Sequence, residues 1–369
     1  MKTTAEIFAE NLKKRRKELG LTQRQLAELI GYSEKAVSKW EKGEVIAPSG
    51  ILPTLARHLL TDIDSLLSYT GEPSFYLGID GGGTKTEFML VSESGETISH
   101  AILTSSNPID IGINKSLELL ENGIEAVCGN VPKSKISVFA GIAGGITGDN
   151  QKKIHSFLGK FHFARFDNGS DAQSAVASAL GAENGTVIIM GTGIVAFSQI
   201  DGKLHRRGGF GYLFENGGSG YAIGREVILA ALKDEEGSGK PTALTELVRK
   251  ALGCESILSQ LSRIYDGGKR EIASFSPLAY EAYVKGDAVA ADILMKNMAE
   301  VAALIESTPK TCHQKEKQPI FLIGGQTKEK EIIIPMINEH LNSPQKYEIT
   351  VTEVPAVFGS LLLAGLPQK

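Results

Sequence analysis

Three glycine turns, each at the end of an apolar run, are the residues of this chain best suited to binding phosphate. The first turn follows the run 77–79, and its residues are Asp80, Gly81, Gly82, Gly83, Thr84 and Lys85. Glycine lets backbone N–H groups approach an anion closely, while the hydroxyl and ammonium groups add donors and positive charge. The Asp80 carboxylate suits a Mg²⁺ ion held largely through water. Because a strand-like run rather than a helix follows, this is neither a P-loop nor a dinucleotide-binding turn.

The other two glycine turns repeat this arrangement later in the chain. Gly191, Thr192 and Gly193 separate the strand-like runs 185–190 and 194–200. Gly324 and Gly325 follow the apolar run 319–323 and precede a helical stretch from Lys328. Two strand–turn–strand units about a hundred residues apart predict duplicated halves that bind one nucleotide.

Asp171 is the candidate general base. It begins an amphipathic helical stretch in NGSDAQSAVASAL (168–180), which places its carboxylate at a helix N-terminus. Phosphoryl transfer needs mainly positioning and charge neutralisation, together with a base near the accepting hydroxyl. A helix N-cap is the other role open to an aspartate at this position, and the two roles are compatible.

The first 68 residues predict a separate helical module. Apolar spacing predicts a helix that ends near Gly20, and further helices over 23–30, 34–42 and, in two stretches, 52–67. Thr22 and Ser33 are suitable N-caps, and Gly31 permits the left-handed turn of a helix-turn-helix. Residues 1–70 carry a net charge of +2 and the remainder −6, which favours an anionic partner for the module. A helical bundle that merely docks on the body is the alternative.

The stretch GLTQRQLAELIGYSEKAVSKWEKG (20–43) resembles the lambda-repressor/Xre type of DNA-binding domain. The resemblance implies that the third helix faces base edges or nearby phosphates with Ser33, Lys35, Ala36, Ser38 and Lys39. Gln23 and Ser33 lie at helix N-termini, whose N–H groups can bind phosphate. The basic run 13–16 is either a solvated face or a set of backbone-phosphate contacts.

Residues 74–367 resemble the N-acetylglucosamine kinase and BadF-type ATPase family, within the acetate-kinase, sugar-kinase, Hsp70 and actin superfamily. The matching blocks are GIDGGGTKT, SSNP, AGIAGG, SDAQSAVASA, GTVIIMGTG, GGFGYLFENGGSGYAIGRE, FLIGGQ and VFGSLLLAG. The resemblance implies an α/β two-lobed ribonuclease-H-like ATPase fold with duplicated mixed-sheet domains. It also implies that ATP and Mg²⁺ bind at the glycine turns in a cleft between the lobes, with Asp171 as catalytic base.

The residues that would face a sugar depart from the family pattern. Asn107 matches an asparagine that holds sugar hydroxyls, and Gly209, Phe210 and Gly211 match a loop whose aromatic side chain packs on the sugar. Where the family reads GDEGS, residues 215–219 read ENGGS, so that Asn216 replaces a sugar-binding aspartate and Gly217 a glutamate. Polar family positions after the second turn are Ile194 and Val195 here. An altered substrate and a loss of turnover both remain open.

We therefore expect an ATP-dependent amino-sugar kinase fused to a DNA-binding domain that couples sugar phosphorylation or sensing to transcription. The alternative is a sugar- and ATP-responsive transcription regulator whose kinase-like body only senses, and a weaker one is an ATPase with an unidentified acceptor. The expected division is a helix-turn-helix domain over 1–68, a linker over 69–74, a first ATPase lobe over 75–185 and a second over 186–369.

Composition excludes several other classes. No apolar run approaches the roughly 18 residues of a membrane helix, and the N-terminus lacks a secretory apolar region, so we expect a cytoplasmic protein without a membrane partner. Cys128, Cys254 and Cys312 are too widely spaced for a disulfide framework or an iron–sulfur cluster, which sets aside the dehydratase-activating branch of the family. Helix-turn-helix proteins commonly bind paired half-sites, so we expect a homodimer on double-stranded DNA.

Overall fold

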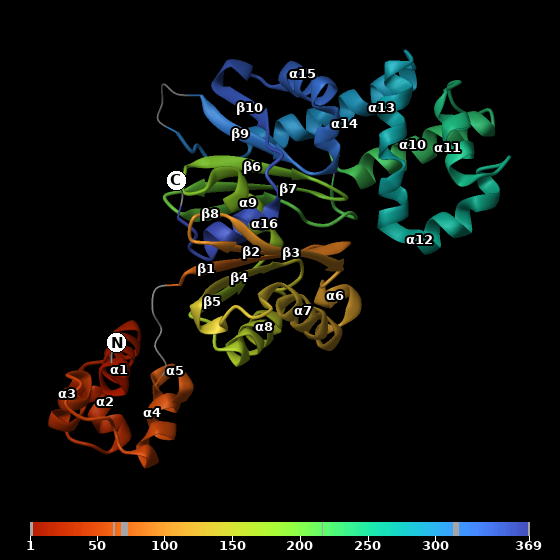
Figure 1. Cartoon of the computed structure of the whole chain (residues 1–369). Coiled ribbons are helices and arrows are strands. Elements are labelled where there is room, and N and C mark those ends of the chain that lie inside the picture. The colour runs from red at the N-terminus through yellow and green to blue at the C-terminus, as the bar shows by residue number, and fades with distance from the viewer. Residues whose placement is uncertain (1–2, 62, 68–72, 216, 313–316, 368–369) are drawn as a thin grey trace. The chain divides into compact units, whose positions relative to one another are not determined.

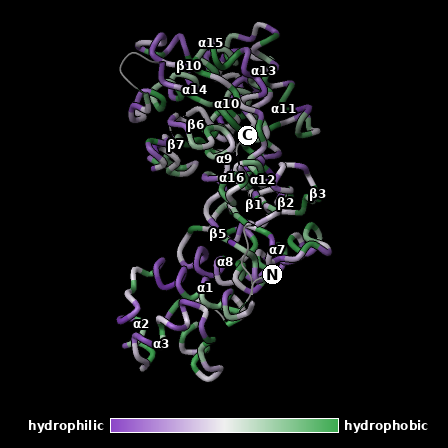
Figure 2. The backbone as a smooth tube through the Cα atoms, turned by 60° about the vertical axis from the view of Figure 1, so that its left-hand side comes forward, coloured by the Kyte–Doolittle hydropathy of each residue, from purple (hydrophilic) through white to green (hydrophobic). Residues whose placement is uncertain are grey.

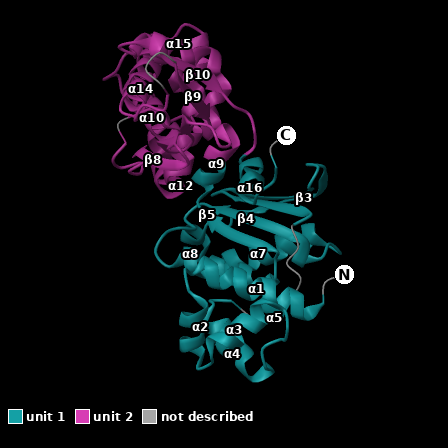
Figure 3. Cartoon of the chain, turned by 90° about the vertical axis from the view of Figure 1, so that its left-hand side faces the viewer, with its two compact units in different colours: residues 1–174, 356–369 teal, residues 175–355 magenta. Residues whose placement is uncertain are grey.

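The computed structural model describes residues 3–61, 63–67, 73–215, 217–312 and 317–367, which form two compact units (Figure 3). The first unit comprises residues 1–174 and 356–369, and the second comprises residues 175–355. The expected division at 185/186 thus falls after the boundary between the units at 174/175, and the C-terminal segment, expected in the second lobe, belongs with the first unit. Much of the expected linker, residues 69–72, lies outside the described residues.

The N-terminal module consists of five short helices (Figure 1). They are α1 (Thr4–Glu18), α2 (Gln23–Ile30), α3 (Glu34–Glu41), α4 (Leu52–His58) and α5 (Ile63–Leu67). Thr22 and Gln25 form a reciprocal capping box at α2, and Gly31 ends this helix with a left-handed φ of 72°. Hydrophilic and hydrophobic residues alternate along these helices (Figure 2), and their apolar faces meet in a core that includes Phe8, Leu26 and Trp40.

A buried ion pair ties the first three helices together. The Nε and Nη2 atoms of Arg16 lie 2.5 and 2.8 Å from the two carboxylate oxygens of Glu41, and the Gln23 amide donates to Glu41 Oε2 at 2.7 Å. The bond from Glu41 raises the pKa of Arg16. Burial alone would raise the pKa of Glu41, but the bonds from Arg16 and Gln23 hold it below its usual value. Arg16 is only 8% exposed, so the idea that it contacts phosphate was wrong.

The first unit contains a mixed five-stranded sheet in the order β3-β2-β1-β4-β5. The strands are β1 (Phe75–Gly81), β2 (Lys85–Ser92), β3 (Thr97–Thr104), β4 (Ile136–Ile142) and β5 (Arg165–Gly169). The strands β1, β2 and β3 pair antiparallel, whereas β4 runs parallel to β1 and β5 parallel to β4. Its helices are α6 (Pro108–Ile111), α7 (Ile113–Cys128), α8 (Asn150–Leu158) and α16 (Ala356–Leu363).

The two faces of this sheet are covered by different helices. Leu77 and Ile79 of β1 point into a core with α7 and α8, while Tyr76 packs with Leu361 of α16 on the opposite face. The Ser360 hydroxyl donates to the carbonyl of Ile79 at 2.9 Å. These contacts are the reason that the C-terminal helix joins the first unit and not the second.

The second unit repeats the same sheet plan in the order β10-β9-β6-β7-β8. Its strands are β6 (Gly185–Met190), β7 (Ile194–Ile200), β8 (Lys203–Gly208), β9 (Gln318–Ile323) and β10 (Tyr347–Val351). Again three strands pair antiparallel and two are added in parallel. This confirms the predicted duplication and the two mixed sheets.

Helices cover both faces of the second sheet, and others pack outside them. The helices are α9 (Asp171–Leu180), α10 (Gly220–Glu235), α11 (Leu244–Leu252), α12 (Leu261–Ser274), α13 (Ser276–Val284), α14 (Ala288–Glu306) and α15 (Lys330–His340). The helices α11 and α12 pack on α10 and α13 and not on the sheet (Figure 1). Val176 and Leu180 of α9 pack on one face with Val187, while α10, α13 and α14 share a large core with Ile188 on the other. Within the described ranges, none of the helices combines the length and the hydropathy needed to cross a bilayer.

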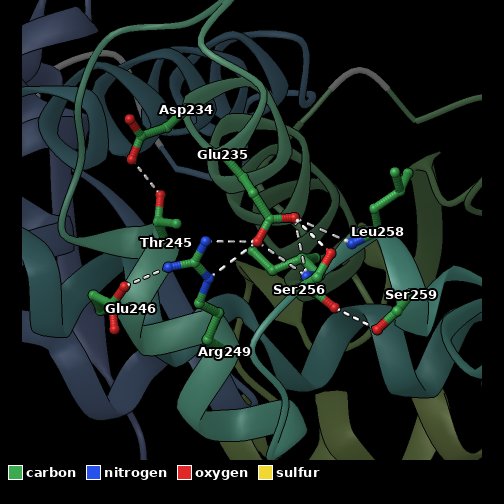
Figure 4. Close-up of polar contacts among 9 residues, drawn as sticks. Asp234, Glu235, Thr245, Glu246, Arg249, Ser256, Leu258 and Ser259 are labelled. Atoms are coloured by element: carbon green, nitrogen blue, oxygen red, sulfur yellow. Dashed lines mark hydrogen bonds and ion pairs between the residues drawn. The ribbon is translucent and has the colours of Figure 1, made fainter.

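Glu235 at the end of α10 holds the helices that follow it (Figure 4). Its carboxylate accepts hydrogen bonds from the Arg249 guanidinium at 2.8 and 3.0 Å and from the backbone N–H groups of Ile257 and Leu258 at 3.0 to 3.3 Å. Burial alone would raise the pKa of Glu235, but these bonds hold the pKa below its usual value. Every donor is satisfied internally, so we assign this network to stability and not to chemistry.

We expect Glu235→Gln to lower the unfolding midpoint at neutral pH, because the neutral amide loses the charged bonds to Arg249. A carboxylate with a lowered pKa stabilises the fold fully above its ordinary pKa of about 4.3 and loses that effect as the pH falls through the lower folded value. The difference between variant and wild type should therefore shrink in acid. Calorimetry across this pH range measures it. Glu246→Gln is the matched control, since Glu246 also contacts Arg249 but is 77% exposed, and a pH-independent difference for Glu235→Gln would contradict the assignment.

Candidate functional site

The first glycine turn is a tight connection between β1 and β2 with an open backbone. The Gly82 N–H donates to the Lys85 carbonyl at 2.9 Å, and the Ser105 hydroxyl donates to the Gly82 carbonyl at 3.0 Å. A Cβ atom on Gly81 would lie 2.3 Å from the Ser106 hydroxyl oxygen, so no larger residue fits there. Thr84 and Lys85 at the turn are exposed, which leaves them accessible to a phosphate.

Lys85 of this turn forms an ion pair with Glu87, which in turn contacts His100. Neither Glu87 nor His100 was singled out from the sequence. The Lys85 ammonium lies 2.8 Å from Glu87 Oε2, and His100 Nε2 lies 3.0 Å from Glu87 Oε1. Burial alone would raise the pKa of Glu87, but Lys85 and His100 hold it below the usual value. The Lys-x-Glu spacing, which places both side chains on one strand face, was the available signal.

Asp80 and Asp171 are brought into electrostatic contact within the first unit. Burial, followed by the negative charge of Asp171, raises the pKa of Asp80 to about 7, and Lys85 only partly opposes this. Burial also raises the pKa of Asp171, against the effect of the N–H group of Ala172. Like charges held in a desolvated place are stabilised by a cation. The two carboxylates and the Thr84 hydroxyl are oxygen donors of the kind that Mg²⁺ prefers, so these residues fit the ion.

The cap of α9 is Ser170 and not Asp171. The Ser170 N–H donates to the Gln173 side-chain oxygen at 2.8 Å, and the Gln173 N–H donates back to the Ser170 hydroxyl at 3.3 Å. This reciprocal box makes Ser170 the N-cap, so that Asp171 is the first residue of the helix. The Asp171 carboxylate still interacts with the N–H group of Ala172 at the start of the helix, and its catalytic role stays a prediction.

Asn107 is the cap of α6. Its side-chain oxygen accepts from the Ile109 N–H at 2.9 Å, and its amide nitrogen lies 3.1 Å from an Asp110 carboxylate oxygen. A Cβ on Gly144 would lie 2.5 Å from the same side-chain oxygen, so Asn107 lies against the AGIAGG block. The residue thus has a local structural function, and its sugar contact stays a prediction.

The second and third glycine turns meet within the second unit. A Cβ on Gly324 would lie 2.5 Å from the carbonyl oxygen of Met190, the last residue before Gly191. The first residues of α10 hold the second turn, since the Gly220 and Tyr221 N–H groups donate to the carbonyls of Gly191 and Thr192 at 2.8 and 3.1 Å. Adjacent glycine turns with accessible backbone groups are suited to a nucleotide.

Gln326, directly after the third turn, was missed by sequence reasoning. Its side-chain oxygen accepts from the Tyr280 hydroxyl at 2.9 Å, and its amide donates to Ser276 Oγ at 2.9 Å. All three residues are buried, and both partners belong to α13. The third turn, which includes Gly325, is therefore anchored to α13 by polar bonds that no local sequence pattern reveals.

Gly209 and Phe210, two of the predicted sugar-facing residues, line a cavity of about 370 Å³ in the second unit. Gly209 and Gly211 both adopt a left-handed backbone conformation, with φ values of 68° and 95°, and Gly209 lies against Val195. The Phe210 side chain between them is 73% exposed. Asn216 lies outside the described residues. A Cβ on Gly217 would lie 3.0 to 3.2 Å from Glu300 and Asn297 of α14, so a side chain there requires α14 to give way.

The predicted DNA-contacting residues lie on the outer side of α3. Ser33 caps this helix by accepting from the Ala36 N–H at 3.2 Å. Lys35 and Lys39 are exposed and Ser38 is half-buried. The Gln23 amide donates one bond to Glu41, and its backbone N–H lies at the start of α2, where such groups can bind phosphate.

Comparisons with known proteins agree with this architecture. Residues 77–364 match the BadF/BadG/BcrA/BcrD ATPase family, and residues 12–66 match a helix-turn-helix family. An N-acetyl-D-glucosamine kinase of Dictyostelium discoideum is 27% identical over 308 residues, which cover 78% of this chain and 97% of that protein.

Two solved structures share the fold. One, from Chromobacterium violaceum and provisionally assigned as an N-acetylglucosamine kinase, has a TM-score of 0.61 at 22% identity and covers 79% of this chain and 99% of that one. The other is a ROK family transcriptional regulator, a homolog of the E. coli MLC protein. It has a TM-score of 0.50 at 13% identity and covers 98% of this chain and 95% of that one.

Proposed function

Because this chain belongs to the BadF/BadG/BcrA/BcrD ATPase family, we propose that it is an ATP-dependent amino-sugar kinase with a DNA-binding module. The observation that carries the proposal is the pair Asp80 and Asp171, two desolvated carboxylates at the mouth of a glycine turn. The curated N-acetyl-D-glucosamine kinase relative supports an amino sugar as the acceptor.

Each residue has a distinct role in this proposal. Asp171 accepts the proton of the sugar hydroxyl, which its raised pKa makes easier near neutral pH. Asp80 and Thr84 would hold Mg²⁺ through water, and such an ion would supply neutralisation of the charge on the phosphates. In the first unit, Lys85 and the glycine N–H groups of the first turn are phosphate-binding groups, and Asn107 is a sugar-binding residue. In the second unit, the second and third turns are phosphate- and adenosine-binding groups, and Phe210 is a sugar-binding residue.

A regulator that senses sugar and ATP without turnover is the second candidate. It is favoured by the altered residues 215–217 and by the fold likeness over nearly the whole chain to a transcriptional regulator. ATP consumption with a panel of hexoses, hexosamines and N-acetylated hexosamines separates the two. Sugar-dependent ADP formation supports the kinase, whereas tight ATP and sugar binding without ADP formation supports the sensor.

For the DNA-binding module, we expect Lys39→Ala to weaken binding to a sequence-preferred site by about 10-fold and to leave ATP turnover unchanged. Lys39 is exposed on α3 and its loss removes a positive charge from the face proposed to read DNA. The measurement is a titration of labelled promoter DNA at fixed salt. Lys17→Ala, an exposed lysine of α1, is the matched control and should not change the ratio of specific to non-specific affinity.

The same titration with sugar and nucleotide tests whether the module and the ATPase body communicate. We propose that the protein binds a roughly palindromic site as a homodimer and that ligands shift its affinity several-fold, since coupling free energies are typically about 1–3 kcal/mol. An affinity that ligands leave unchanged would contradict the coupling but not the DNA binding. Equal binding to all sequences would contradict the regulatory role.

A further inference from the structure

The lysine of the first glycine turn is held by a buried acid on the same strand. Lys85 and Glu87 are two residues apart on β2, so both side chains leave the same face of the sheet. The Lys85 ammonium lies 2.8 Å from Glu87 Oε2. The Glu87 side chain is only 12% exposed, whereas that of Lys85 is 58% exposed. The ion pair therefore has a fixed inner end and an accessible outer end.

His100 of β3 holds the other oxygen of the same carboxylate. It lies opposite Met89, two residues along β2 from Glu87, and therefore on the same face of the sheet. Long side chains reach such diagonal neighbours across antiparallel strands. His100 Nε2 lies 3.0 Å from Glu87 Oε1. Both oxygens of Glu87 thus have a partner, which limits the positions that the carboxylate can take.

The bond to Glu87 leaves Lys85 able to bind a phosphate. An ammonium group has three N–H donors, and this bond uses one of them. Because most of the Lys85 side chain is exposed, the ammonium can present its other donors to a phosphate while it keeps the bond to Glu87. A lysine side chain is flexible, and ordering such a side chain on binding costs free energy. In this chain, Glu87 has already restricted that freedom before a ligand arrives.

The negative charge of Glu87 has an opposing effect, because it repels phosphate. Despite its burial, Glu87 has a lowered pKa as a result of the bonds from Lys85 and His100, so it is ionised at neutral pH. Glu87 and Lys85 act on the nearby Asp80 in opposite directions, as expected of a pair without net charge. Water screens the ammonium that removal of Glu87 would leave unpaired, so restraint of Lys85 should be the larger effect.

We propose that Glu87 and His100 are positioning residues for a nucleotide: His100 fixes Glu87, and Glu87 holds the Lys85 ammonium where the first glycine turn receives a phosphate. Neither Glu87 nor His100 contacts the phosphate itself. The inference rests on the proposed function for the binding of ATP at this turn, but not for the sugar or for turnover. Protein kinases, another class of phosphoryl-transfer enzyme, likewise need a lysine–glutamate ion pair in place.

The test is calorimetric titration of the full-length protein with ATP and with adenosine, both with Mg²⁺ and without sugar. We expect Glu87→Gln to weaken ATP binding about 5-fold, the effect of one side chain that must be ordered on binding, and to leave adenosine binding unchanged, since adenosine has no phosphate for Lys85. His100→Ala should weaken ATP binding by a smaller factor. His100→Gln, whose amide can donate to Glu87, should restore it.

The matched control is Glu125→Gln. Glu125 lies in the last turn of α7 and forms an ion pair with Lys133 at 2.6 Å, so this variant also removes the acid of a lysine ion pair in the first unit. It should change neither affinity. Equal weakening of ATP and adenosine binding by Glu87→Gln would indicate a purely structural role and overturn the inference.

A Lys85→Met background separates the restraint of Lys85 from a direct effect of the Glu87 charge. Lys85→Met should itself weaken ATP binding, and the addition of Glu87→Gln should then weaken it no further. Equal weakening by Glu87→Gln in both backgrounds would overturn the inference, since Glu87 would act without Lys85. Tighter ATP binding by Glu87→Gln would also overturn it, since Glu87 would then be a repelling charge.

The same variants separate this inference from the proposed kinase. The expected responses of ATP binding, together with no ATP consumption on any sugar, would support the positioning role and refute the kinase. Sugar-dependent ADP formation, together with an unchanged ATP affinity in Glu87→Gln, would refute the positioning role and leave the kinase standing. A wild-type protein that binds no ATP would refute both.

Discussion

Asp171→Asn is expected to lower kcat by about 100-fold or more while nucleotide affinity stays nearly unchanged. The amide is isosteric but cannot accept the proton of the sugar hydroxyl. The helix itself should survive the substitution, because Ser170 and Gln173 form the cap of α9. Steady-state kinetics with the preferred sugar and calorimetric titration with ATP analogue measure the two quantities.

The matched control for this variant is Asp167→Asn. Asp167 lies four residues earlier, and its side chain is 71% exposed. Its carboxylate lies 3.8 Å from His155 Nδ1 and accepts from the Asn168 N–H at 2.8 Å. It should leave kcat near the wild-type value. Turnover that survives Asp171→Asn would remove Asp171 from the mechanism, and a parallel loss of nucleotide affinity would indicate a role in holding Mg²⁺.

Asp80→Asn should produce a protein that is more stable without ligand and nearly inactive with ATP. The folded pKa of Asp80, about 7, exceeds its ordinary value, so ionisation of this buried group opposes folding. That penalty is absent in acid, grows as the pH rises from about 4 toward 7, and is complete above this range. The variant should therefore gain thermal stability over wild type only as the pH rises, on the order of 5 °C at its upper end.

The response of the same variant to Mg²⁺ and ATP distinguishes a role of Asp80 in metal binding from a purely destabilising effect of its buried charge. If Asp80 holds Mg²⁺, Asp80→Asn should also abolish the extra stabilisation that Mg²⁺ with ATP gives the wild type. The control is Asp292→Asn. The Asp292 side chain is 72% exposed in an ion pair with Lys240, so this variant should change neither the stability nor the stabilisation by Mg²⁺ with ATP. A stability gain that does not depend on pH would contradict the raised pKa, and full Mg²⁺-dependent turnover would contradict the metal role.

Local chemistry explains what could be predicted of the fold. The two strands of the unit at 185–200 begin and end at the residues that the sequence predicts, because apolar strand runs and glycine turns are encoded by neighbouring residues. The helix-turn-helix was predictable for the same reason: Thr22, Ser33 and Gly31 act on the turns beside them. The C-terminal helix was misplaced because its partner strands, β1 and β4, lie more than two hundred residues away.

The sequence by itself determined the two duplicated halves, the helix-turn-helix module and the glycine turns, because each depends on spacing within a few residues. Only the tertiary structure decided which charges meet. It buries Asp80 and Asp171 and so raises both pKa values, with the charge of Asp171 adding to the shift of Asp80. It also buries Arg16 against Glu41 and leaves Glu215 Oε2 without a partner among the described residues. Burial and charge proximity between distant residues set these properties, and neither is encoded in the residue types alone.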